Sequence, residues 1–432
     1  MDKEIKERIA AINNGIIPEG YKKTKVGIVP VEWDRYKLSD ISDELTEKAG
    51  NNAYETLSIS AGIGFVNQAN KFGKELSGKQ YEKYIVLHKG DFSYNKGNSK
   101  KYPQGCIYQL KDRDEAAVPN VFESFRLNKG INDYYEQLFV SGFLNRQLFA
   151  KINHGVRDDG LLNLKGEDFY SCYVPFPPLP EQQKIAEILS TQDKLIELQE
   201  KKIEQLKELK KAYLQKMFPK KGSKYPELRF KGFTDPWEQR KLGDDLESIQ
   251  TGTNLLGSIT NHGTPLLKMG NIQRGYFDIS KLEFLNENET VEKENIAYYG
   301  DFFFNTRNTL ELVGKGATWT GENGKYAFNS NIARFTFKDI DTIFFNYLYN
   351  TEEITTQIHA RATGTTSVAA IYPKSLNTVF YYIPSKEEQI KIGNFFFQLD
   401  SLITLYQRKS EQEKQKKKAL MQLLLTGIVR TK

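Results

Sequence analysis

The stretch EQQKIAEILSTQDKLIEL, Glu181–Leu198, returns near the end of the chain as EQIKIGNFFFQLDSLITL, Glu388–Leu405. Extended without gaps, the match aligns Val174–Phe218 with Tyr381–Leu425, and 17 of the 45 positions are identical. Helical composition alone rarely holds one register over this length. The repeat therefore predicts that the chain contains two copies of one unit.

Both copies have the pattern of a long amphipathic helix. Apolar residues in the first copy recur at spacings of three, four or seven, which is typical of a coiled-coil-like seam. They are Ile185, Leu189, Ile196, Ile203, Leu206, Tyr213 and Met217. A helix of about 37 residues is about 55 Å long. Such a seam needs a partner, and we expect the sister helix to provide it; two unrelated surface helices would leave both seams uncovered.

The two helices follow bodies that begin alike. Pro30–Ile41 resembles Thr234–Leu246, which pairs Trp33 with Trp237, but the segments beyond show almost no identity. Short runs such as KYIVLH and DFFFNT, separated by Gly, Asn and Asp, predict strands joined by turns. The expected fold class is α+β, with two β-rich mixed domains related by internal duplication and joined by two long helices. The topology of each body stays open.

The expected segments follow from these boundaries. We place the first body at residues 1–178 and the first helix at 179–218. The second body takes 219–384, with a short linker at 219–226, and the second helix takes 385–428.

Composition narrows the class of protein. A chain of 432 residues suits two or more domains, and its net charge of 61 − 55 = +6 permits nucleic-acid binding without requiring it. Two cysteines, Cys106 and Cys172, are too few for a zinc site or a disulfide framework. No apolar run approaches the roughly 20 residues of a membrane span, and the N-terminus lacks a signal peptide's apolar stretch. We expect a soluble cytoplasmic protein.

A search for catalytic motifs finds none that is complete. Gly73–Lys79 matches a phosphate-loop pattern, but the next residue is Gln80, which lacks the hydroxyl that binds Mg²⁺. An adenine methyltransferase would have Asp or Asn before its Pro-Pro pair, where this chain has Phe176. The four histidines lack metal-ligand spacing. The sequence therefore predicts a non-catalytic protein that holds no cofactor itself.

Polar and basic residues mixed with glycines and aromatics mark loops in both bodies. Arg and Lys can read guanine, Asn and Gln can read adenine, and Gly lets the backbone approach phosphate. The candidates for DNA contact are Asn95, Lys96, Lys100, Lys101, Arg157, Gln273, Arg274, Tyr276, Arg307, Asn308, Lys315, Arg361, Thr365 and Thr366. Ordinary solvated loops are the alternative for any one of these segments, and their occurrence in both bodies weakens it.

The order of body, helix, body and helix resembles the specificity subunits of type I restriction-modification systems. The most specific parts of the likeness are Pro180–Leu198, Pro226–Leu242 and the run GTTSVAAIYPKSLNTVFYYIPSKEEQ, Gly364–Gln389. The likeness extends over essentially the whole chain.

Two places depart from the family pattern. In Val156–Tyr170 the expected small residues are replaced by Asp158 and Asp159, and the second helix has a polar middle, Gln407–Lys418. Contacts carried over to the first segment, and the packing of the second, therefore need the structure.

The resemblance implies two target recognition domains, each reading one half of a bipartite site in double-stranded DNA. The two helices would pack antiparallel as a spacer that sets the gap between the half-sites and docks two methyltransferase (M) subunits. Two restriction and motor (R) subunits would complete the complex. S-adenosylmethionine, ATP and Mg²⁺ would belong to those partners, and no membrane is involved.

Two other functions remain as alternatives. A fused restriction-methylation enzyme would need a cofactor loop and an Asn/Asp-Pro-Pro-aromatic motif, and neither is present. A helical scaffold without a DNA role would show no shift of DNA in a binding assay.

Overall fold

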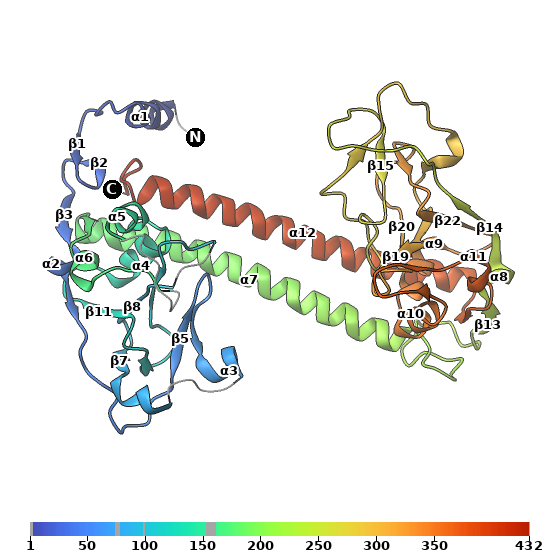
Figure 1. Cartoon of the computed structure of the whole chain (residues 1–432), viewed down its shortest axis with the longest axis horizontal. Helices are drawn as coiled ribbons and strands as arrows, with labels where there is room; N and C mark the ends of the chain where they lie inside the picture. The colour runs from blue at the N-terminus through green and yellow to red at the C-terminus, as the bar shows by residue number, and fades with distance from the viewer. Residues whose placement is uncertain (1–2, 74–77, 98–99, 153–160, 432) are drawn as a thin grey trace. The chain divides into compact units, whose positions relative to one another are not determined.

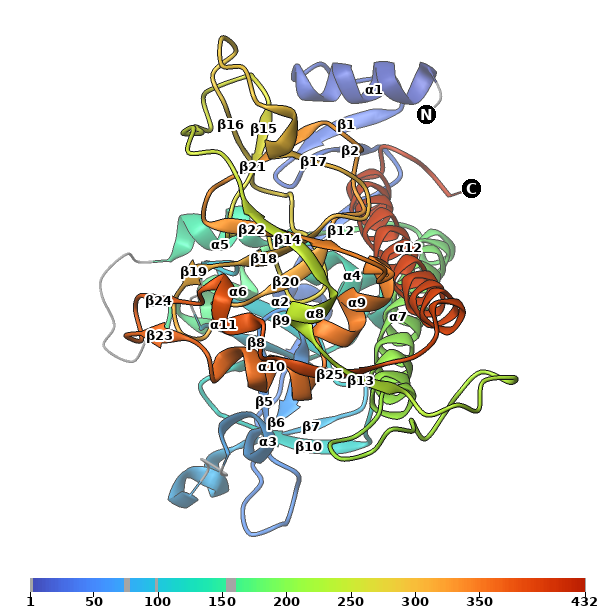
Figure 2. The ribbon, with the colours of Figure 1, turned by 90° about the vertical axis from the view of Figure 1, so that its right-hand side faces the viewer.

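The computed structural model describes residues 3–73, 78–97, 100–152 and 161–431. The chain forms two compact units: unit 1 is Met1–Gln199 with Lys409–Lys432, and unit 2 is Glu200–Arg408. This grouping differs from the expected segments 1–178 and 219–384, because each long helix contributes one end to the core of unit 1 and the other end to the core of unit 2. Figures 1 and 2 label the helices and strands where there is room.

The two long helices are α7 (Leu179–Met217) and α12 (Lys386–Leu424), each of 39 residues. Glutamates in the first turn of both suit the positive end of the helix dipole. Within each unit, the start of one helix packs beside the end of the other, so the two segments run antiparallel. No helix in the described part of the chain is both long and apolar enough to cross a bilayer.

The first turns of α7 complete the core of unit 1. Ile185 and Leu189 are fully buried in one apolar cluster with Leu424, the last residue of α12, and Leu425, which follows it. In unit 2 the start of α12, with Ile392, packs in the core beside the end of α7. The expected pairing of the repeated helices is therefore present within each unit.

An antiparallel four-stranded sheet forms the centre of unit 1, in the order β4-β11-β8-β9. The strands are β4 (Ser42–Glu44), β8 (Phe92–Asn95), β9 (Cys106–Gln109) and β11 (Glu123–Leu127). Side chains alternate across a strand, so Phe92 and Tyr94 share one face. With Phe125 they pack in the core that also contains α4 (Asn132–Val140) and the start of α7.

Unit 2 repeats this sheet with the order β14-β22-β18-β20. Its strands are β14 (Leu246–Thr251), β18 (Phe302–Asn305), β20 (Gly316–Thr318) and β22 (Ile332–Phe337). Phe302 and Phe304 face α9 (Thr342–Tyr349) and the long helices, whereas Phe303 packs on the opposite side in a second apolar cluster. The bodies thus share a topology that their sequences do not reveal.

Smaller sheets extend both bodies. In unit 1 they are β5 (Leu57–Ser60) with β6 (Gly64–Asn67), β7 (Ile85–His88) with β10 (Glu115–Val118), β3 (Asp34–Lys37) with β12 (Tyr173–Phe176), and β1 (Tyr21–Thr24) with β2 (Gly27–Pro30). In unit 2 they are β13 (Glu238–Lys241) with β25 (Phe380–Ile383), and β15 (Pro265–Leu267), β16 (Glu283–Phe284), β17 (Ile296–Ala297) and β21 (Tyr326–Phe328) in one sheet.

Short elements complete the two units. Unit 1 also contains α1 (Lys3–Asn13), α2 (Leu38–Ile41), α3 (Gln68–Phe72), η1 (Gly78–Lys83), α5 (Asn145–Lys151) and α6 (Gly166–Tyr170). Unit 2 also contains α8 (Leu242–Asp245), η2 (Lys293–Asn295), β19 (Arg307–Asn308), α10 (Glu352–His359), β23 (Thr363–Gly364), β24 (Ala369–Ala370) and α11 (Pro373–Leu376).

One glutamine at the start of each long helix joins it to its body by the same two bonds. Gln182 donates to the carbonyl of Pro177 at 2.8 Å and accepts from the amide of Ile131 at 2.9 Å. Gln389 donates to the carbonyl of Pro384 at 3.0 Å, and it also accepts from the amide of Asp341 at 3.0 Å. Because these side chains are buried, each bond satisfies a group that would otherwise be costly to bury.

Candidate nucleic-acid interface

Three basic and polar segments of unit 2, far apart in sequence, meet at one surface. Strand β24 pairs with both β19 and β23, and the amide of Leu310 donates to the carbonyl of Thr366 at 3.1 Å. The third segment joins through Arg274, whose Nη2 donates to the carbonyl of Glu311 at 3.3 Å. Figure 2 shows β19, β23 and β24 together beside the main sheet. The predicted loops of unit 2 thus form one continuous surface.

Arg274 and Lys315 place two cations close together on this surface. Nη2 of Arg274 also donates to Nε2 of His359 at 3.1 Å, and Nζ of Lys315 donates to Oε1 of Gln273 at 2.8 Å. Partial burial, with the charge of Arg274 as a further cause, lowers the pKa of Lys315. The same two causes lower the pKa of His359. An anion at this surface would relieve the repulsion between the cations.

Other candidates of unit 2 lie exposed around this cluster. Arg307 on β19 is exposed and makes no side-chain hydrogen bond or ion pair within the described residues. Tyr276 is 61% exposed, and Thr365 and Thr366 lie exposed between β23 and β24. Asn308 is partly buried, and its Oδ1 accepts from the amide of Thr309. Arg307 and Thr366 are therefore available for an external contact, whereas the hydroxyl of Thr365 lies 3.2 Å from that of Ser367 and accepts from the amide of Val368 at 3.3 Å.

Arg361 is engaged within unit 2. Its Nε donates to the carbonyl of Ser375 at 2.9 Å, and its Nη1 donates to the carbonyl of Gln357 at 2.7 Å. Nη2 donates to the carbonyl of Thr378 at 2.8 Å, and the Thr378 hydroxyl accepts as well. This arrangement favours a structural role for Arg361, which joins the end of α10 to the segment after α11.

The candidates of unit 1 divide in the same way. Asn95 donates to the carbonyl of Ile59 at 3.3 Å and accepts from the amide of Gly97, and Lys96 pairs with Glu123 at 2.9 Å. Both are thus held within the body. Lys100 and Lys101 are exposed, and Arg157 lies outside the described residues.

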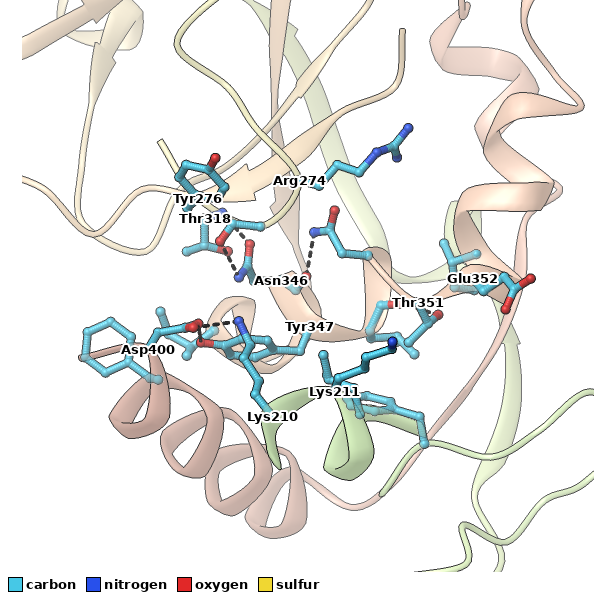
Figure 3. A pocket seen from close by; sticks show the side chains of 18 of the residues that line it. Lys210, Lys211, Arg274, Tyr276, Thr318, Asn346, Tyr347, Thr351, Glu352 and Asp400 are labelled. Carbon is cyan, nitrogen blue, oxygen red and sulfur yellow. Dashed lines mark hydrogen bonds and ion pairs between the residues drawn. The ribbon is translucent and has the colours of Figure 1, made fainter. Parts of the chain in front are cut away.

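A groove of about 2160 Å³ opens in unit 2 between the long helices and the body. Eight lysines and arginines line it against four carboxylates. Asp400 is bonded to Nζ of Lys210 at 2.6 Å and to the hydroxyl of Tyr347 at 2.8 Å. Figure 3 shows Arg274 on the opposite side of the groove, with its guanidinium pointing away from this pair. The excess positive charge favours a negatively charged occupant.

The structure adds two residues that the sequence analysis did not select. His359 and the carbonyl of Glu311 both hold Arg274. The role of a single histidine or of a backbone oxygen cannot be predicted from one sequence, because neither forms a recognisable motif. Among the described residues, no group of three or more His, Cys, Asp or Glu side chains is arranged to hold a metal ion.

Comparison with known proteins identifies the repeated unit. Residues 30–208 and 234–415 each match the family described as the type I restriction modification DNA specificity domain. The MjaVIII type I restriction enzyme specificity subunit of Methanocaldococcus jannaschii is 28% identical over 314 residues, which cover 71% of this chain and 72% of that one. The EcoKI specificity subunit of Escherichia coli K12 is 27% identical over 198 residues, covering 41% and 40%.

Solved structures show the same fold. The S subunit of a type I system from M. genitalium superposes with a TM-score of 0.57 at 16% identity, covering 91% of this chain and 96% of that one. A chain from a structure of type I restriction-modification complex assembly and conformational transition gives a TM-score of 0.51 at 16% identity, covering 93% and 99%.

Proposed function

Because the chain belongs to the family of type I restriction-modification DNA specificity subunits, we propose that each of its two target recognition domains reads one half of a bipartite site in double-stranded DNA. As a specificity subunit it is the non-catalytic component of its system. The observation that carries the proposal is the meeting of the three loops of unit 2 at one surface, with Arg274, Lys315 and Arg307 upon it.

The chemistry of this surface suits DNA. Arginine and lysine donate to guanine O6 and N7, whereas exposed threonines and backbone amides position phosphates. The excess positive charge of the groove supports the same assignment, because neutralising phosphates releases counterions and strengthens binding at low salt.

The partners follow from exposed leucines that the duplication has placed twice. Leu195 and Leu198 of α7 are 43% and 63% exposed, and their repeat counterparts Leu402 and Leu405 of α12 are 42% and 45% exposed. Equivalent apolar patches in both units suit two copies of one partner. We assign them to two M subunits. Two R subunits would complete the complex. S-adenosylmethionine, ATP and Mg²⁺ would bind to the M and R subunits, and the complex would lie in the cytoplasm.

The long helices would set the gap between the half-sites. Inserting four helical residues after Gln199 and four after Arg408 adds about 6 Å to each helix and about 40° beyond a full turn, so each seam stays nearly aligned. Base pairs are about 3.4 Å apart, and we expect one or two additional unread pairs. An active complex with an unchanged gap would show that the helices do not set it.

Replacing one body tests the main proposal. The segment Asp244–Pro384 is exchanged for the matching segment of a relative, and the chain is co-expressed with its M subunits. Methylome sequencing should then show one half of the methylated motif changed and the other half retained. Changes in both halves, or no sequence-specific methylation from the unaltered complex, would contradict the proposal.

A further inference from the structure

We propose that Arg274 reads a base edge, with guanine O6 or N7 as its acceptor, and that His359 is the positioning residue that orients it. The inference rests on the proposed reading of DNA by unit 2. It goes further by assigning a base contact to one side chain and a supporting role to another.

Arg274 is held from two other segments of unit 2, the loop that contains Glu311 and the end of α10. Both bonds are made by Nη2, one to the carbonyl of Glu311 and one to Nε2 of His359. A guanidinium has five N–H donors, so Nε and Nη1 remain for an outside acceptor. The residue itself is exposed. An arginine fixed on one side and open on the other presents its remaining donors in a defined place.

Gln273 and Lys315, which lie beside Arg274, bond to each other within the domain. Gln273 accepts from Lys315 through Oε1 and donates to the carbonyl of Gly270 at 2.8 Å through Nε2. Of these three side chains Arg274 is the exposed one, and its Nε and Nη1 make no bond among the described contacts. The bonds of its neighbours further stiffen the loop that carries it.

His359 acts as an acceptor, which requires a neutral ring. A guanidinium can only donate, so Nε2 supplies a lone pair and the proton is on Nδ1. Burial first, and the charge of Arg274 second, lower the pKa of His359 and favour this neutral form. The ring comes from the last residue of α10, and a helical residue positions a side chain more accurately than a loop does.

Support of this kind distinguishes base reading from phosphate binding. A phosphate contact carries no sequence information directly and orients the protein on the duplex, whereas a base contact must place a donor at one point in a groove. The two bonds on Nη2 limit the rotation of Arg274. A contact to phosphate alone would not need this second layer.

The test uses the full chain assembled with its M subunits and DNA sites that differ at single positions. The unit-2 half-site is first found by methylome sequencing of the unaltered complex. The variants are Arg274→Lys, His359→Ala and His359→Gln, whose amide oxygen can still accept. The matched control is His262→Ala, an exposed histidine of the same unit outside the cluster.

We expect Arg274→Lys and His359→Ala to reduce discrimination at the same single base pair by about 5- to 150-fold. His359→Gln should retain most of it, and His262→Ala all of it. Thermal unfolding of each complex confirms that the variants fold.

Three results would overturn the inference. One is equal weakening by Arg274→Lys on all sequences with a shallower salt dependence, which identifies a phosphate contact. Another is that Arg274→Lys reduces discrimination at the base pair whereas His359→Ala does not, which would show that His359 does not position Arg274. The third is unchanged discrimination in both variants. In each case the unaltered complex still methylates a bipartite site, which separates this failure from failure of the proposed function.

Discussion

The two ends of the helix pair are built from the same repeated segments and differ in the side chains that lie between the helices. In unit 2, Leu206 of α7 and Leu399 of α12 are buried in one apolar core. Their repeat counterparts in unit 1 are Glu413 and Gln192, which bond to each other. A duplicated backbone therefore keeps its helix pairing when an apolar contact is replaced by a hydrogen bond, provided that the polar groups find partners.

The same comparison applies at the start of each helix. Glu181 of unit 1 accepts from Nε1 of Trp33 at 2.9 Å and from Arg430. Its counterpart in unit 2, Glu388, is fully buried and is held by Arg229 through both Nε and Nη2 at 2.7 Å. Nε1 of Trp237 makes no hydrogen bond among the described residues. Unit 2 therefore depends on its arginine more than unit 1 does.

The largest effect is expected from Arg229→Met. Removing one partner of a buried ion pair leaves a desolvated charge, so the free energy of unfolding should fall by about 3–5 kcal/mol. Hydrogen exchange of peptides from each unit is the measurement, because the whole chain need not unfold in one step. The double variant Arg229→Met with Glu388→Gln should recover part of the lost stability, because it removes the unpaired charge. If Arg229→Met alone lowered the free energy of unfolding by less than roughly 1 kcal/mol, other groups would have to stabilise the Glu388 carboxylate.

Ile203→Ala should come next. Ile203 is buried in the core of unit 2, and truncating a buried isoleucine costs about 2–5 kcal/mol through lost burial and the cavity left behind. Reduced exchange protection should appear in peptides of unit 2. Equal loss in both units would show that the helix pair unfolds as one element.

Arg430→Met should have a smaller effect than Arg229→Met. Glu181 loses charged hydrogen bonds, worth about 1.5–3 kcal/mol, but keeps the indole of Trp33. Urea unfolding measures the loss in free energy of unfolding, and hydrogen exchange of peptides from unit 1 shows that the loss lies in that unit. If Arg430→Met and Arg229→Met proved equally destabilising, the indole of Trp33 would not compensate for the lost arginine. In that case, adding Trp33→Phe to Arg430→Met would cause no further loss of stability.

The smallest effect, with the opposite sign, is expected from Ser410→Ala. Ser410 is the repeat counterpart of Ile203; it is buried, and its hydroxyl has no hydrogen-bond partner among the described residues. Removing an unsatisfied hydroxyl should stabilise unit 1 by about 1 kcal/mol. The same alanine at two equivalent positions should thus move stability in opposite directions. A loss in unit 1 would indicate that a water or partner satisfies Ser410.

The sequence predicted the helices well because their information is local. Periodic apolar residues placed them at 179–218 and 385–428, and the structure has them at Leu179–Met217 and Lys386–Leu424. The topology of the bodies depends on pairings such as Arg126 with Asp43, and no local pattern sets such a register. The repeated sheet order was therefore not readable from either body alone.

The candidate site was predictable as segments and less so as individual contacts. Convergence of the three loops in unit 2 agrees with their shared composition of basic residues, amides and glycine. Arg361 has the same residue type as Arg274, but its surroundings engage its donors. Which arginine faces outward depends on backbone carbonyls that the loops bring together, and carbonyls have no residue-type signature.

Gln182 and Gln389 have a consequence for how such a chain can change. Each fastens its helix to main-chain groups of the body, namely the amides of Ile131 and Asp341 and the carbonyls of Pro177 and Pro384. Every residue type other than proline supplies that amide, and every residue supplies that carbonyl. The joint therefore makes little demand on the body's composition, and a foreign body with the same backbone path can be seated without altering the helix. If each body reads its own half-site, as proposed, genetic exchange at these two joints would give the chain a new target in a single event.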